Sequence, residues 1–196
     1  MRRRNVCRRL IGAVVLSLPA AALACLLINV YFPSHRHCMK IGTLALFSYA
    51  DAHGDRFPDH HDGYGDALLL MGEEDWQFLT GPGYDTTPFR EAKAAGRGLP
   101  EEQCGRVYVR GLTTKAGSQV ALLFDKKATR GGDHAGFPVR VFASRGREVG
   151  FGDGFMRFVR DRDWPAFAAE QIDLLTNEGI PRAEAERLYG QVIPRP

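Results

Sequence analysis

The pattern of apolar and polar positions divides the chain into an uncharged apolar segment, an amphipathic stretch and a longer region of short alternating runs. The amphipathic stretch runs from Cys38 to Pro58. Its three- and four-residue spacing predicts a helix with one apolar face, made of Ile41, Leu44, Ala45, Ser48, Tyr49 and Ala52. Gly54 and Pro58 predict the end of this helix, because glycine adopts the left-handed conformation easily and proline prevents helical continuation.

The apolar segment precedes this helix and spans Leu10–Phe32, 23 residues without a charge. About 20 apolar residues suffice to cross a bilayer. Five arginines in the first nine positions favour a cytoplasmic N-terminus. We therefore predict a basic leader at 1–9, a single-pass inner-membrane anchor at 10–32 and a periplasmic remainder. The alternatives are a signal peptide cleaved after a small residue within 20–24, or lipidation at Cys25.

The remainder predicts an α+β domain at 33–163, followed by a C-terminal helical hairpin and tail at 164–196. We expect the long helix to pack on a small, mostly antiparallel sheet, with a tight turn at Asp153-Gly154. Strands are expected at 107–109, 119–124, 139–143, 148–151 and 155–159, with a turn at 144–147. Alternation places one apolar set on the buried face of the sheet: Phe142, Val149, Phe151, Met156 and Phe158.

The other elements follow from the same signals. A short helix is expected within 67–79 and a loop at 81–98. Pro165 and Gly179 mark the ends of the first C-terminal helix, and Pro181 and Gly190 those of the second.

Charge changes this picture little. The formal net charge is +3, and five of the 26 basic residues belong to the leader. The rest of the chain is slightly acidic, which argues against nucleic acid as a partner. Abundant glycine and proline fit a domain rich in turns.

The densest group of possible metal ligands is the run Asp59, His60, His61 and Asp62. Such residues can hold Ca²⁺ or Zn²⁺. The spacing matches neither an EF-hand loop nor a helical His-x-x-x-His pair. A solvated turn explains the same residues. We predict no other cofactor.

Two cysteines, Cys38 and Cys104, fall in the region expected outside the membrane, where disulfides persist. A bond between them would tie the long helix to the middle of the domain. The alternative is two buried free thiols.

The sequence carries no nucleophile elbow, phosphate loop or dinucleotide fingerprint. His134 with Asp133 and Asp153 could form an acid–base pair, but turn chemistry explains them equally well. We therefore predict that the protein is not an enzyme.

Two separate groups of residues resemble the pseudopilin-like proteins of the type II secretion and type IV pilin superfamily, in the form found in planctomycete and verrucomicrobial bacteria. The first group comprises Cys38, Lys40-Ile41-Gly42, Tyr49, Asp51, Gly54 and Pro58; the second comprises His134 and Asp153-Gly154 with the strand that follows. The usual prepilin cleavage motif is missing, because Gly12 is followed by Ala13 to Ser17 with no acidic residue.

This resemblance implies a membrane-anchored structural or assembly subunit of a type II secretion or type IV pilus-like system. Its expected partners are the membrane and other secretion or pilus-like subunits. The alternative is a membrane-tethered extracytoplasmic binding domain that holds a metal through the loop at 59–62.

Overall fold

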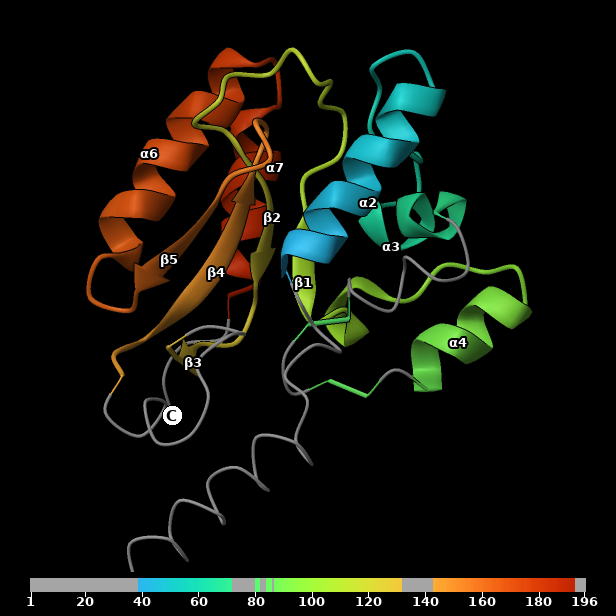
Figure 1. Ribbon diagram of the computed structural model, residues 1–196, viewed down its shortest axis with the longest axis horizontal. Coiled ribbons are helices and arrows are strands. Elements are labelled where there is room, and N and C mark those ends of the chain that lie inside the picture. Colours follow the sequence, from blue (N-terminus) through green and yellow to red (C-terminus); the bar gives the residue numbers. More distant parts are fainter. Residues whose placement is uncertain (1–38, 72–79, 82–83, 86, 132–142, 193–196) are drawn as a thin grey trace, which may run out of the picture.

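The computed structural model describes residues 39–71, 80–81, 84–85, 87–131 and 143–192. In this part of the chain the fold is α+β, with an antiparallel sheet and helices on both of its faces (Figure 1). The predicted fold class is confirmed at this level. In chain order the elements are α2 (Met39–Ala52), α3 (Tyr64–Ala67), η2 (Leu68–Leu70), α4 (Thr87–Ala94), η4 (Glu101–Gln103), β1 (Arg106–Tyr108), β2 (Ala121–Asp125), β3 (Thr129–Arg130), β4 (Arg145–Phe151), β5 (Met156–Arg160), α6 (Trp164–Asn177) and α7 (Arg182–Gly190).

Strand β4 is the centre of the sheet. It pairs with β2 and β3 along one edge and with β5 along the other, and β1 extends the sheet beyond β2. The predicted hairpin at Asp153-Gly154 is confirmed, since it joins β4 to β5. The register pairs Phe124 with Val149 and Leu123 with Gly150, so neighbouring residues of β2 point to opposite faces.

Aromatic side chains fill the face that α6 and α7 cover. Phe124 stacks on Tyr189 with ring centroids 4.6 Å apart, and lies 5.7 Å from the ring of Trp164. Phe151 meets Phe167 edge to face at 6.3 Å. Each large ring removes much apolar surface from water, so this layer supplies a large share of the core. Helix α6 begins beside Pro165, as the sequence predicts.

The opposite face packs against α2 through small residues. The helix buries Gly42, Thr43 and Ala50. A Cβ atom added at Gly150 of β4 would lie only 2.3 Å from Thr43 Oγ1, so helix and strand approach closely here.

The predicted apolar face of this helix is wrong at most of its positions, although Ala45 is buried as predicted and Tyr49 is partly buried. Ile41 and Leu44 are 38 % and 53 % exposed, while Met39 and Leu46 are fully buried. The buried side of the helix combines small residues, which permit the backbones to approach closely, with the large side chains of Met39 and Leu46. The three- and four-residue spacing on which the prediction rested did not identify this side of the helix.

The predicted strand pairing is also wrong in part. The turn expected at 144–147 belongs mostly to β4, which starts at Arg145. Met156 and Phe158 pair with Gly150 and Glu148, and therefore lie on the α2 face, opposite Val149. Residues 139–142, including Phe142, lie outside the described part of the chain.

Two predicted elements between the helix and the sheet also differ. Helix α4 occupies part of the stretch 81–98 that was expected to be a loop. Of the short helix expected within 67–79, residues 72–79 lie outside the described part of the chain, and α3 and η2 place helical turns from Tyr64 to Leu70.

The predicted anchor at 10–32 falls outside the described residues. Of the helices that the structure describes, none is both long and apolar enough to cross a membrane.

Candidate functional site

The loop that carries the candidate metal ligands is held in place from both sides. Before it, Gly54 takes a left-handed conformation (φ 66°) that ends α2, and the amide of Asp55 donates to the carbonyl oxygen of Ala50 at 3.0 Å. Tyr108 in β1 donates its hydroxyl hydrogen to the Pro58 carbonyl oxygen at 2.6 Å. Arg110 donates to the carbonyl oxygen of His60. These hydrogen bonds from Tyr108 and Arg110 therefore hold the backbone of the loop that carries His60 and His61.

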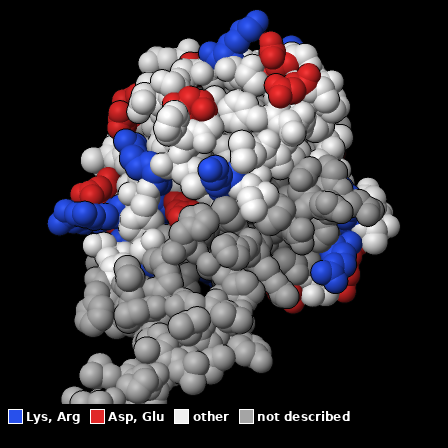
Figure 2. Space-filling model, viewed as in Figure 1, with Lys and Arg blue, Asp and Glu red and all other residues white. Residues whose placement is uncertain are grey.

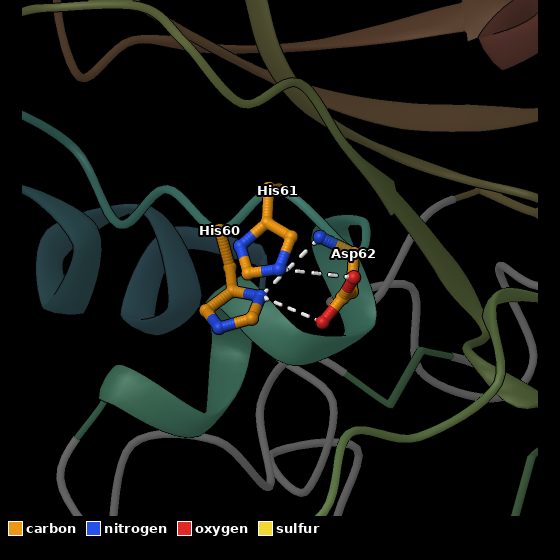
Figure 3. A group of neighbouring side chains, drawn as sticks. All are labelled: His60, His61 and Asp62. Carbon is orange, nitrogen blue, oxygen red and sulfur yellow. Dashed lines mark hydrogen bonds and ion pairs between the residues drawn. The ribbon is translucent and has the colours of Figure 1, made fainter.

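Three of the four predicted ligands come together (Figure 3). The rings of His60 and His61 stack with centroids 4.4 Å apart. The Asp62 carboxylate faces both rings: Oδ2 lies 3.6 Å from His60 Nδ1, and Oδ1 lies 3.2 Å from His61 Nε2. One ligand atom from each residue falls within 4.8 Å of the others.

Two imidazole nitrogens and one carboxylate oxygen form a donor set that suits Zn²⁺ better than Ca²⁺, because calcium prefers oxygen ligands throughout. Three protein ligands would leave a coordination position for water. The side chains of His61 and Asp62 are 82 % and 62 % exposed, so an ion could reach them from solvent. The Asp62 amide already donates to His60 Nδ1 at 3.3 Å, and a metal on that nitrogen would have to displace this bond.

The fourth predicted ligand does not join the others. Asp59 lies 4.0 Å from the guanidinium of Arg110. Both side chains line a cavity of about 360 Å³, together with Ile180 in the turn before α7 and Leu188 in α7 itself. The loop therefore presents two separate groups: His60, His61 and Asp62 lie together, and Asp59 lies near Arg110.

The residues that carry the pseudopilin resemblance take structural positions. Tyr49 stacks on His53 at 3.7 Å. Asp153 accepts a hydrogen bond from the Phe155 amide at 2.9 Å, and Gly154 has φ 82°, so both shape the β4–β5 turn. A Cβ atom on Gly154 would lie 3.8 Å from Phe47 in α2. His134 falls outside the described residues.

The structure describes one of the two cysteines for which a disulfide was predicted. Cys104 is a free and fully buried thiol in the structure, as the alternative of unpaired thiols expects for this residue. Cys38, the other half of the predicted bond, lies outside the described residues. Burial raises the pKa of Cys104 to about 12, with the nearby Lys126 opposing the shift. The thiol is therefore protonated and weakly nucleophilic at neutral pH.

The structure places a polar cluster next to this thiol, and this cluster was not predicted from the sequence. Lys126 is buried, its ammonium donates to the Glu101 carbonyl oxygen, and burial lowers its pKa. Tyr64 Oη lies 2.8 Å from Gln191 Oε1. Arg187 bridges the carboxylates of Glu101 and Glu184. These residues are up to 127 positions apart in the chain, and no local motif links them.

The cluster borders a cavity of about 450 Å³ lined by both signs of charge. The guanidinium of Arg187 is already shared by two carboxylates, so the arrangement braces α7 against the middle of the chain.

Comparison with known proteins finds no match: no family model, no curated protein and no solved structure is similar to this chain.

Proposed function

We propose that this protein is a membrane-anchored, pseudopilin-like structural or assembly subunit of a type II secretion or type IV pilus-like system. In this proposal a transmembrane helix at 10–32 continues into α2, and α6 and α7 form a C-terminal helical hairpin over the sheet. The partners are the inner membrane and other secretion or pilus-like subunits. The protein performs no catalysis.

The observation that carries the proposal is the meeting of the two sequence elements that resemble pseudopilins. They lie about 100 positions apart, yet the Asp153-Gly154 turn reaches α2 at Phe47. The helix that follows the apolar segment packs along the sheet, and Gly54 to Pro58 tie its end to β1. Ile41 and Leu44 remain exposed on α2 and offer an apolar surface to a neighbouring subunit.

Membrane fractionation and photo-crosslinking of the full chain in its native host test this proposal. We expect the chain to stay with the membrane after an alkaline carbonate wash. A photoreactive residue at Leu44 should crosslink to a secretion or pilus-like subunit. The same residue at Asp173, exposed on α6, is the matched control and should not. Recovery of the chain as a free monomer in the soluble periplasm would contradict both the anchor and the assembly role.

A second candidate function is metal binding by His60, His61 and Asp62, favoured by the convergence of their three ligand atoms. In this case the protein is a tethered extracytoplasmic binding domain. The donor set predicts Zn²⁺ over Ca²⁺.

Thermal unfolding of the full chain in mild detergent tests the metal. Zn²⁺ should raise the melting temperature, and His60→Ala with His61→Ala should abolish the rise. His53→Ala removes another exposed histidine and should leave it unchanged. If neither Zn²⁺ nor Ca²⁺ shifts the melting temperature, the loop is a solvated turn.

A further inference from the structure

A group of arginines lies at the end of the sheet where β4 starts and β5 ends. Register pairs Arg130 with Arg145 and Gly146 with Arg160 across these strands. A cavity of about 320 Å³ opens there, lined by Ser144, Arg145, Arg160, Asp161 and Arg162, and we call it the arginine pocket. Figure 2 shows basic and acidic side chains gathered at the edge of the molecule where Figure 1 has the turn between β5 and α6.

Positive charge exceeds negative charge around this pocket. The Asp161 carboxylate lies 2.7 Å from Arg147 Nη1 and 3.9 Å from Arg145 Nε, so two guanidinium groups share it. Arg162 lies 3.4 Å from Asp163. In the described part of the chain no carboxylate lies within ion-pair distance of Arg160. Among the described residues, Arg145, Arg147, Arg160 and Arg162 against Asp161 and Asp163 give a formal charge of +2 (4 − 2).

The start of α2 points toward the same end of the sheet. Thr43 packs against Gly150, and Phe47 packs against Gly154 further along, so α2 runs in the same direction as β4. Met39 therefore lies toward the Arg145 end, and in Figure 1 both α2 and β4 start at their lower ends. Phe32 and Met39 are seven positions apart (39 − 32), which bounds the distance between them at roughly 25 Å.

We propose that the arginine pocket binds the phosphate of an anionic phospholipid headgroup, in the membrane that holds residues 10–32. The inference rests on the anchor in the proposed function, which brings this end of the domain to the bilayer surface. Guanidinium groups donate in a planar fork that matches phosphate oxygens, and arginine is weakly hydrated for a cation. Basic residues close to an anionic membrane surface are attracted to it and so strengthen the binding of a protein to that membrane. Exposed arginines suit that surface, since their stems can lie along lipid while the charge meets phosphate.

Native mass spectrometry of the full chain in mild detergent measures the headgroup preference directly. The probes are dihexanoyl-phosphatidylglycerol, dihexanoyl-phosphatidylcholine and inorganic phosphate. We expect phosphatidylglycerol to bind about tenfold more tightly than phosphatidylcholine. Equal affinity for the two lipids would overturn the proposal. Inorganic phosphate that binds as tightly as phosphatidylglycerol would also overturn it, since the site would then serve free phosphate.

Variants test whether the preference for phosphatidylglycerol depends on the arginine pocket. Arg145→Gln with Arg160→Gln and Arg162→Gln should remove it. Arg90→Gln with Arg97→Gln and Lys115→Gln removes the same charge from exposed positions elsewhere and should retain it. Arg160→Gln alone breaks no ion pair among the described residues, so it should weaken the preference without unfolding the protein. A triple variant that folds and keeps the full preference would refute the assignment.

The anchor is tested separately, by carbonate extraction of the chain from vesicles of phosphatidylcholine alone. Release from these vesicles would defeat the anchor and, with it, the membrane as the source of the ligand. Retention without a headgroup preference in detergent would defeat the arginine pocket alone.

Discussion

The two faces of the sheet are packed by opposite means. On the α6–α7 face, rings from Phe124, Trp164 and Tyr189 fill the space between sheet and helices. On the α2 face, Thr43 and Gly150 bring the backbones together, and a fully buried ion pair joins Arg106 to Asp125 at 2.9 Å. A ring layer adapts to modest changes of volume, whereas close backbone contact and a buried ion pair depend on individual atoms.

The largest expected effect comes from breaking the buried ion pair. Asp125→Ala removes the carboxylate 2.9 Å from Arg106 Nε, in a place where both side chains are 0 % exposed. We expect the free energy of unfolding to fall by about 3–5 kcal/mol, because a buried charge loses its counter-charge. Denaturant titration of the full chain in detergent measures this.

Asp173→Ala is the control for that experiment. It breaks a surface pair with Arg182 at the same 2.9 Å, and should cost less than about 1 kcal/mol. Similar losses in the two variants would mean that the buried pair contributes no more than a surface pair.

A methyl group at the contact between α2 and β4 tests the close approach. Gly150→Ala places a Cβ atom 2.3 Å from Thr43 Oγ1 and should cost about 1–3 kcal/mol through overpacking. Adding Thr43→Ala removes the clashing oxygen and leaves the nearest helix carbon 3.5 Å away, so it should restore most of the loss. Additive losses in a double-mutant cycle would contradict the docking of α2 on β4.

On the aromatic face, Tyr189 offers a stabilising change. Its hydroxyl is buried and has no hydrogen-bond partner among the described residues, and burial raises its pKa. Tyr189→Phe keeps the stack on Phe124 and removes the unsatisfied group, so stability should rise by up to about 1 kcal/mol. A clear loss in the same denaturant titration would mean that the hydroxyl is hydrogen-bonded.

The smallest effect concerns pH at α7. The hydrogen bond from Arg187 to Glu184 lowers the pKa of that carboxyl below its usual value near 4.5. A lowered folded-state pKa adds stability that is present above the unfolded value and is lost as pH falls through the folded value. Stability should therefore decline below about pH 4.5, by less than about 1 kcal/mol because the pair is partly exposed. Glu184→Gln should flatten that decline, and an identical pH profile in the variant would argue against the bond.

The parts of the candidate site that one loop supplies were predictable from the sequence. His60, His61 and Asp62 are consecutive, so their convergence needs only a turn, and the turn is present. Asp59 could not be placed, because its partner Arg110 follows a strand 51 positions later (110 − 59). The polar cluster around Lys126 was missed for the same reason: its members come from distant parts of the chain and share no spacing.

What the sequence by itself determined was local. Gly54 ends α2, Asp153-Gly154 makes the β4–β5 turn and Pro165 marks the first turn of α6, because glycine permits a positive φ and proline fixes φ wherever they occur. The tertiary structure alone decided which side of α2 is buried and which strands flank β4. It also decided that Arg106 meets Asp125. Each of these depends on close contact between residues far apart in the chain, and hydrophobic periodicity carries no record of such contacts.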